Sequence, residues 1–335
     1  MKKISALIAV ILAAGLTAVA AEPLKLETKY QMPPAIQGRF DHLTVDLRGH
    51  RLFVTAESEH QVLVFDLSDG KFIRTMPDIS IPHAVFCRAD LDRIYVTDGG
   101  TGELKIYDGK TYKLIGSAKL KVDADSIGYD PATHYLYIDN GGGDAHESFS
   151  MLSVVDTTSG KKVADIQIDG ETLEAMALAH SSSRLYVNNA AKNQVDVVDR
   201  KTRQLEASWP VTMGKRNVAM ALDESAHRLF VACRSGVIVV FDTDSGKELQ
   251  SLPIAQGVDD LLFDPASKRL YAACGSDGGS IAVYHEDDPN HYTSLGQVAS
   301  APRGKNIALA PDGRLFITIP PQGGSPGEVY VYKVQ

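Results

Sequence analysis

The sequence has few cysteines, and it lacks the common motifs of nucleotide and haem chemistry. Cys87, Cys233 and Cys274 are the three cysteines, and their spacing matches no zinc or disulfide framework. The sequence also has no P-loop, no nucleophile elbow, no GxGxxG turn after a strand and no CxxCH haem site. Nothing in the motifs therefore points to nucleotide or haem chemistry.

Long apolar runs are also missing beyond the first 21 residues. Lys2 and Lys3 precede an uncharged apolar run from Ile4 to Val19, and small residues stand at 18, 20 and 21. This pattern is typical of a signal peptide with an A-x-A cleavage site, and the run is short for a spanning helix. We predict a signal peptide over residues 1–21, a periplasmic or secreted mature protein, and no membrane insertion after cleavage.

Positive charge is scarce as well. The chain has 34 Lys and Arg against 42 Asp and Glu, so its formal net charge is −8, and the basic residues are scattered. Loss of Lys2 and Lys3 with the leader makes the mature charge more negative. Because such a chain repels phosphate backbones, we expect no nucleic-acid partner.

The strongest pattern present is an internal repeat of about 40 residues. A short apolar and aromatic anchor recurs as LFV at Leu52, IYV at Ile94, LYI at Leu136, LYV at Leu185, LFV at Leu229, LYA at Leu270 and LFI at Leu315. The successive spacings are 42, 42, 49, 44, 41 and 45 residues. A period of this size indicates a solenoid or a propeller.

Each repeat reads as four short β-strands rather than as helices. A first strand such as HLTVDL (42–47) precedes the anchor, a third such as QVLVFD (61–66) follows it, and turns such as SDGK (68–71) open a fourth. Turn residues at these intervals predict four-stranded antiparallel blades. The fold predicted is all-β, a seven-bladed β-propeller.

The seventh repeat stops after its third strand, at Gln335. The alternating segment LKLETKYQM (24–32) precedes the first repeat and can supply the missing strand. We predict that it pairs with residues 328–334 and closes the ring, because an open ring leaves a strand edge unpaired. Residues 22–335 then form one domain.

The repeat also indicates whether the cysteines can form a disulfide. Cys233 and Cys274 occupy equivalent places in neighbouring repeats, which stack about 10 Å apart in a propeller. A disulfide needs Cα atoms within about 7 Å. We therefore expect buried free thiols.

Three of the anchors with their flanking residues, IYVTD (94–98), LYIDN (136–140) and LYVNN (185–189), and the segment GKELQSLPI (246–254), resemble the YVTN-repeat β-propellers of bacterial extracytoplasmic proteins. The resemblance covers nearly all of the mature chain, although Cys233, Cys274 and Ile319 replace the motif's Asn in the last three repeats. It implies the seven-bladed fold. It favours a binding or interaction scaffold, since no fixed catalytic motif accompanies the repeat.

In such a blade, the loop that enters the first strand and the loop that joins the second to the third lie on the same face. The residues of the entering loops should crowd the mouth of the central channel. They are Arg39, Asp41, His42, His83, Asp123, Asp125, Glu174, Arg216, Asn217, Asp259, Asp260, Lys305 and Asn306. Polar residues line any wet channel, but two histidines among carboxylates and amides are also the ingredients of a divalent-cation site or of acid–base chemistry.

Two long loops should reach the same face, residues 141–150 and 320–328. Gly-rich loops beside a mouth are binding loops in some proteins and tolerated insertions in others. His146 and Glu147 are the candidate residues of the first loop.

Two functions remain open. One is an extracytoplasmic scaffold that binds a small-molecule or protein ligand at the mouth through a polar or metal site. The alternative is a lactonase- or lyase-type enzyme at the same mouth, as in similar seven-bladed enzymes. The sequence specifies no cofactor, and a divalent cation stays open.

Overall fold

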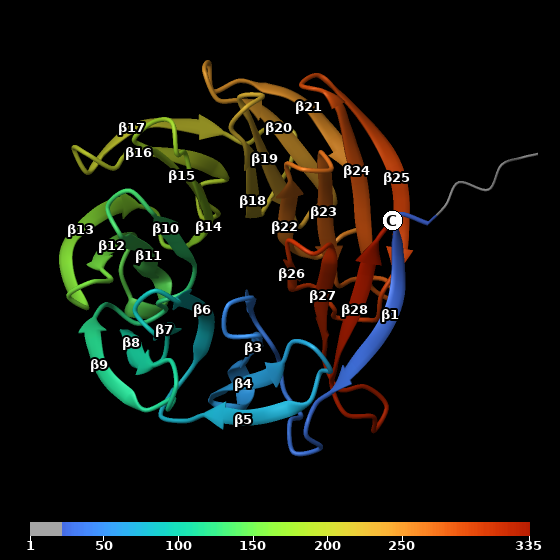
Figure 1. Cartoon of the computed structure of the whole chain (residues 1–335). Helices are drawn as coiled ribbons and strands as arrows, with labels where there is room; N and C mark the ends of the chain where they lie inside the picture. Colours follow the sequence, from blue (N-terminus) through green and yellow to red (C-terminus); the bar gives the residue numbers. More distant parts are fainter. Residues whose placement is uncertain (1–21) are drawn as a thin grey trace, which may run out of the picture.

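The computed structural model describes residues 22–335, and the predicted signal peptide lies outside them. Seven four-stranded antiparallel sheets stand as blades around a ring (Figure 1). The predicted seven-bladed propeller is confirmed. Across residues 22–335, none of the helices is long and apolar enough to cross a membrane.

Each blade contributes one strand to each of four concentric positions. The innermost strands are β2 (Leu43–Asp46), β6 (Pro82–Arg88), β10 (Ile127–Asp130), β14 (Leu173–Leu178), β18 (Asn217–Asp223), β22 (Val258–Asp264) and β26 (Ile307–Leu309). The second strands are β3 (Arg51–Ala56), β7 (Arg93–Asp98), β11 (Tyr135–Gly141), β15 (Arg184–Asn189), β19 (Arg228–Cys233), β23 (Arg269–Cys274) and β27 (Arg314–Ile319). The third are β4 (Gln61–Asp66), β8 (Glu103–Asp108), β12 (Phe149–Asp156), β16 (Gln194–Asp199), β20 (Val237–Asp242), β24 (Ser280–Asp288) and β28 (Glu328–Val334).

The outermost strands are β5 (Phe72–Met76), β9 (Leu114–Lys119), β13 (Lys161–Asp169), β17 (Gln204–Pro210), β21 (Glu248–Pro253), β25 (His291–Ala299) and β1 (Leu24–Gln31). Two short 3₁₀ turns, η1 (Glu57–Glu59) and η2 (Gly142–Ala145), lie between second and third strands.

The repeated anchors form the second strand of every blade. Leu52, Phe53 and Val54 of β3 are all fully buried, and the same pattern recurs in the other second strands. Both faces of a strand at this position pack on neighbouring blades, which explains the nearly continuous apolar run. The outermost strands face solvent, as in β1, where residues 25–29 are all exposed between the buried Leu24 and Tyr30.

An aspartate at the end of a third strand fixes the turn into the fourth. Oδ1 of Asp66 accepts a hydrogen bond from the backbone N–H of Ser68 at 2.8 Å, and Asp242 binds the N–H of Asp244 in the same way at 2.8 Å. Gly70 and Gly246 follow with φ of 73° and 70°, in the left-handed region that glycine adopts freely. These hydrogen bonds and φ angles explain why the Asp and Gly residues of the sequence form turns at these places.

The ring closes through β1 and β28. They pair antiparallel from Leu24 opposite Val334 to Gln31 opposite Glu328. Leu24 is fully buried in a cluster with Tyr271 of blade six and Leu315 of blade seven. The predicted closure by the N-terminal strand is confirmed.

Closure gives a stability prediction. Leu24→Ala should cost roughly 2–5 kcal/mol of unfolding free energy, because it leaves a cavity at the seam between the first and last strands. The melting temperature should fall by roughly 5–15 °C. Leu26→Ala is the matched control, since Leu26 lies on the same strand and is 42% exposed. Equal melting temperatures for the two variants would contradict a role for β1 in closure.

All three cysteines are free, with Cys233 and Cys274 buried and Cys87 partly buried. Burial raises the pKa of both Cys233 and Cys274 to about 12, so neither thiol ionises readily in the folded protein.

We therefore expect the folded protein to react slowly with a thiol reagent and the unfolded, unreduced protein to react with three equivalents. Titration in denaturant measures the count. Reaction with only one equivalent of reagent would show that two of the three cysteines form a disulfide.

Candidate functional site

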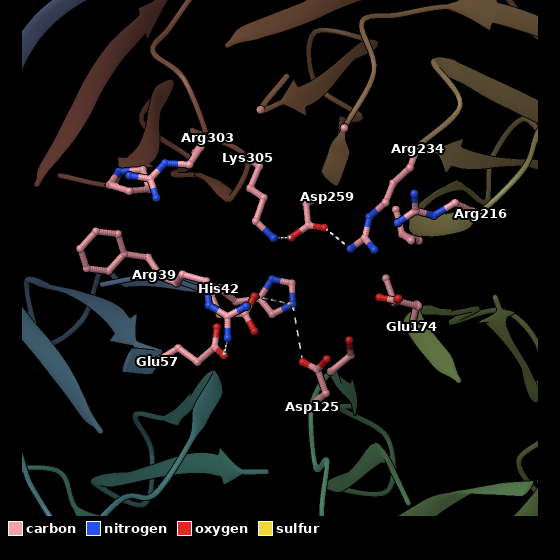
Figure 2. A pocket seen from close by; sticks show the side chains of 18 of the residues that line it. Arg39, His42, Glu57, Asp125, Glu174, Arg216, Arg234, Asp259, Arg303 and Lys305 are labelled. Atoms are coloured by element: carbon pink, nitrogen blue, oxygen red, sulfur yellow. Dashed lines mark hydrogen bonds and ion pairs between the residues drawn. The ribbon is translucent and has the colours of Figure 1, made fainter. Parts of the chain in front are cut away.

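A cavity of about 550 Å³ lies at the channel mouth, the end of the ring where the innermost strands begin (Figure 2). Its walls come from blades one and three to seven, and they include the loops that join the second strand to the third. The Arg39 side chain of an entering loop pairs with Glu57 of η1 at 2.5 Å, which ties the two kinds of loop together. The charged side chains that line it are Arg39, Asp41, His42, Glu57, Asp125, Glu174, Arg216, Arg234, Asp259, Arg303 and Lys305.

Most of the residues singled out in the sequence meet at this cavity. Eight of them line it, namely Arg39, Asp41, His42, Asp125, Glu174, Arg216, Asp259 and Lys305. His83 and Asn306 contact that group. Nδ1 of His83 lies 2.6 Å from Oδ2 of Asp41, and the Asn306 amide lies 3.3 Å from Oδ2 of Asp259.

The other five singled-out residues do not line the cavity, namely Asp123, Asn217, Asp260, His146 and Glu147. Asn217 is fully buried and donates from its amide to Asn188 of blade four at 2.8 Å, although its neighbour Arg216 lines the cavity. Arg216 lies just before β18 in a left-handed backbone conformation, with φ of 58°, so it is outside the strand that buries Asn217. His146 is exposed at the end of η2 and is not part of the cavity wall, while Glu147 pairs with Lys121.

The sequence reading missed three residues that matter here. Arg234 directly follows β19 in a short second-to-third-strand loop, and Arg303 precedes β26. Asp139 is 3% exposed, and its Oδ1 has no hydrogen-bond partner within residues 22–335. Burial and the nearby Asp125 raise the pKa of Asp139 well above its usual value. The sequence alone could have indicated Asp139, because the other anchors have Thr, Asn or Ala at the equivalent position.

One wall of the cavity joins two histidines to carboxylates. Nε2 of His42 lies 3.9 Å from Oδ1 of Asp41 and 3.9 Å from Oδ1 of Asp125. Nδ1 of His42 faces Oδ1 of Asp260 at 3.3 Å. Burial opposes charge on His42, but Asp260 and Asp41 outweigh it and raise the pKa of His42 well above its usual value.

Burial and neighbouring charges also shift the pKa values of the other titratable groups of this wall. Burial would lower the pKa of His83, but the hydrogen bond to Asp41 and the charge of Asp125 raise it to about 9. Burial and Asp41 raise the pKa of Asp125. Burial and Asp125 raise the pKa of Glu174 to about 8. At neutral pH this wall therefore holds protons on Glu174 and His83.

The opposite wall is cationic. Asp259 accepts from Arg234 at 2.5 Å and also from Lys305, so two cations share one carboxylate (Figure 2). Arg303 donates to the backbone carbonyl of Pro321 at 2.7 Å. The Arg216 guanidinium has no hydrogen-bond or ion-pair partner among residues 22–335. This side of the cavity carries surplus positive charge.

Comparison with known proteins agrees with the fold. No protein-family model matches the chain. The seven-bladed beta-propeller protein Rv1057 of Mycobacterium tuberculosis is 30% identical over 132 residues, which are 38% of this chain and 33% of that protein. The uncharacterized protein YncE of Salmonella typhi is 28% identical over 101 residues, 30% of this chain and 28% of that protein. The matched segments thus span about a third of these relatives.

Two solved structures superpose on nearly the whole ring. A chain of the mitotic checkpoint complex has a TM-score of 0.75 at 13% identity and covers 100% of this chain and 99% of its own. A chain of hydrazine synthase from Kuenenia stuttgartiensis has a TM-score of 0.73 at 15% identity, over 89% of this chain and 97% of its own. At such low identity the likeness shows the fold alone.

The fold and the cavity define a seven-bladed β-propeller with a charged channel mouth. Its anchors and these relatives make the chain similar to YVTN-like seven-bladed propellers, as the sequence indicated.

The raised pKa values predict a loss of stability in mild alkali. The folded protein keeps protons on Glu174 and His83 up to pKa values of about 8 and 9, whereas the unfolded chain releases them at lower pH. The stability that Glu174 contributes is therefore lost as the pH rises from about 4.5 to about 8, and that of His83 from about 6.5 to about 9. Glu174→Gln cannot ionise, so thermal melting should show it several degrees more stable than the parent at about pH 9 and equal to it near about pH 4.

The exposed Glu171, three residues before Glu174, provides the control. We expect Glu171→Gln to follow the parent at every pH. A Glu174→Gln variant that loses stability in alkali as steeply as the parent would show that Glu174 is ionised throughout.

Proposed function

We propose that this propeller is an extracytoplasmic binding scaffold whose channel-mouth cavity holds a small organic anion. The observation that carries the proposal is the uncompensated guanidinium of Arg216 on a wall that also holds Arg234, Arg303 and Lys305. Arg216 is exposed at the cavity wall. A guanidinium there without a carboxylate partner can donate two parallel hydrogen bonds to a carboxylate or phosphate group.

The charge of the whole chain strengthens this inference. The sequence carries a net charge of −8, yet one wall of its main cavity is positive. Asp259 can balance only one of its two cationic partners, and no carboxylate contacts Arg303 within residues 22–335. A charged cleft with low-dielectric walls focuses its field on the space inside, so it selects anions against the general repulsion of the surface.

The cavity size sets the ligand class. A volume of about 550 Å³ is in the range of small-molecule sites rather than of protein docking surfaces. The wall facing the cations offers Asp41, Asp125 and the protonated Glu174, which can exchange hydrogen bonds with hydroxyl groups. A small polar molecule with an acidic group at one end and hydroxyls at the other fits both walls.

The lactonase- or lyase-type alternative rests on a different observation. Glu174 has a pKa of about 8 and lines the same cavity, so it holds a proton that it can donate near neutral pH. Assays with aliphatic lactones separate the two functions. Turnover that falls at least about ten-fold in Glu174→Gln favours the enzyme, whereas anion binding without turnover favours the scaffold.

Extracytoplasmic location is supported by the leader pattern of residues 1–21. Fractionation of cells that express the full chain tests it: the periplasm or medium is the expected location, and the cytoplasm would contradict it.

Calorimetric titration with succinate and with inorganic phosphate tests anion binding. We expect binding that weakens with added salt and falls at least about ten-fold in Arg216→Ala, a change of about 1.4 kcal/mol. Arg48→Ala is the control, because Arg48 is exposed in the turn at the far end of β2. A response to one probe only tells carboxylate from phosphate recognition. No binding of either probe, or equal effects of the two variants, would contradict the proposal.

A further inference from the structure

The imidazole of His42 and two carboxylates surround one point at the cavity wall. Nε2 of His42 is 3.9 Å from Oδ1 of Asp41 and 3.9 Å from Oδ1 of Asp125, and one ligand atom from each residue lies within 4.8 Å of the other two. These separations are too long for hydrogen bonds. A point equidistant from three such atoms is at most about 2.5 Å from each, which is within reach of metal–ligand distances in proteins.

Asp125 supplies a second, independent observation. Its Oδ1, the atom that faces His42, is buried and has no hydrogen-bond partner within residues 22–335. A buried carboxylate oxygen without a partner costs free energy comparable to a lost hydrogen bond. A bound cation would supply the missing partner.

The surrounding contacts orient each of these groups toward the same point. Asp260 faces Nδ1 of His42 at 3.3 Å, and the Asp260 carboxylate is itself held by the backbone N–H of Ile307 at 2.8 Å. This leaves Nε2 directed at Asp41 and Asp125. His83 binds Oδ2 of Asp41 at 2.6 Å, and Oδ1 accepts only a long hydrogen bond from the Asn306 amide at 3.5 Å, so a lone pair of Oδ1 remains for an ion. Carboxylates behind a ligating histidine, and hydrogen bonds to ligating carboxylates, are usual at metal sites.

We propose that Asp41, His42 and Asp125 bind one divalent first-row transition-metal ion, with Asp260 and His83 as positioning residues. An imidazole nitrogen favours such ions over calcium and magnesium, which take oxygen ligands. Three protein ligands leave coordination positions that face the 550 Å³ cavity. The ion would therefore lie within reach of a ligand in the cavity. The site does not depend on anion binding, and metal salts alone test it.

The experiment is a titration of chelator-treated protein with ZnCl₂, followed by calorimetry. We expect one equivalent to bind, and Asp125→Asn and His42→Gln each to weaken binding by at least about 100-fold, since each removes one of three ligands. Two ligand variants keep the test valid if one of them does not fold, as circular dichroism will show. One equivalent of Mn²⁺ should bind more weakly than Zn²⁺.

Asp260→Asn tests the positioning role. We expect it to weaken binding roughly 10–100-fold while keeping the one-to-one stoichiometry. Co²⁺ in place of Zn²⁺ gives a visible spectrum that depends on ligand geometry, and this spectrum should change in Asp260→Asn. A residue with only a structural role would alter the melting temperature and leave the spectrum of the bound ion unchanged.

His227 and Asp244 provide the matched control. They form an exposed histidine–aspartate pair at 3.0 Å in turns at the opposite end of the blade. His227→Gln should bind Zn²⁺ as the parent does. The proposal is overturned if the parent binds no equivalent of Zn²⁺ at about 100 μM, which is weak for three protein ligands, or if Asp125→Asn binds as tightly as the parent.

Discussion

The pairing of β1 with β28 is the constraint on which the rest of the structure depends. A propeller blade buries its faces only against two neighbours, so the first and last blades are stable only when the ring is closed. The cavity depends on closure for the same reason. Asp41 of blade one lies 3.5 Å from the Asn306 amide of blade seven, and His42 of blade one faces Asp260 of blade six. These contacts cross the seam that β1 closes.

The sequence was sufficient for the fold because the information is repeated. Each anchor must be apolar on both faces, and each turn needs an Asp or a Gly at a fixed place, so seven weak patterns reinforce one another. The closing strand could be predicted from the number of strands in each repeat, since the last repeat lacked a fourth strand. Topology then placed the entering loops at one mouth, which is why Asp41, His42 and Asp125 could be grouped without a structure.

The candidate site was less accessible to sequence reasoning, because side-chain direction is decided locally. Arg216 and Asn217 are adjacent, yet one lines the cavity and the other is buried against blade four. The loop with His146 was recognisable from its length, but its path depends on the ion pair between Glu147 and Lys121, which lie 26 residues apart. Arg234 sits in a short loop, where nothing in its local pattern distinguishes it from a solvated arginine.

The strand that closes the ring also has a consequence for how the chain folds. Leu24 and Val334 are partners at opposite ends of the sequence, so their pairing is among the most non-local contacts that the chain can make. Contacts of this kind form slowly, and the waiting strand is an unpaired β-edge that could pair with other chains. Lys25, Glu27 and Lys29 are exposed along β1. Their charges discourage such association, so the closing strand carries its own protection against aggregation while the last blade is still unformed.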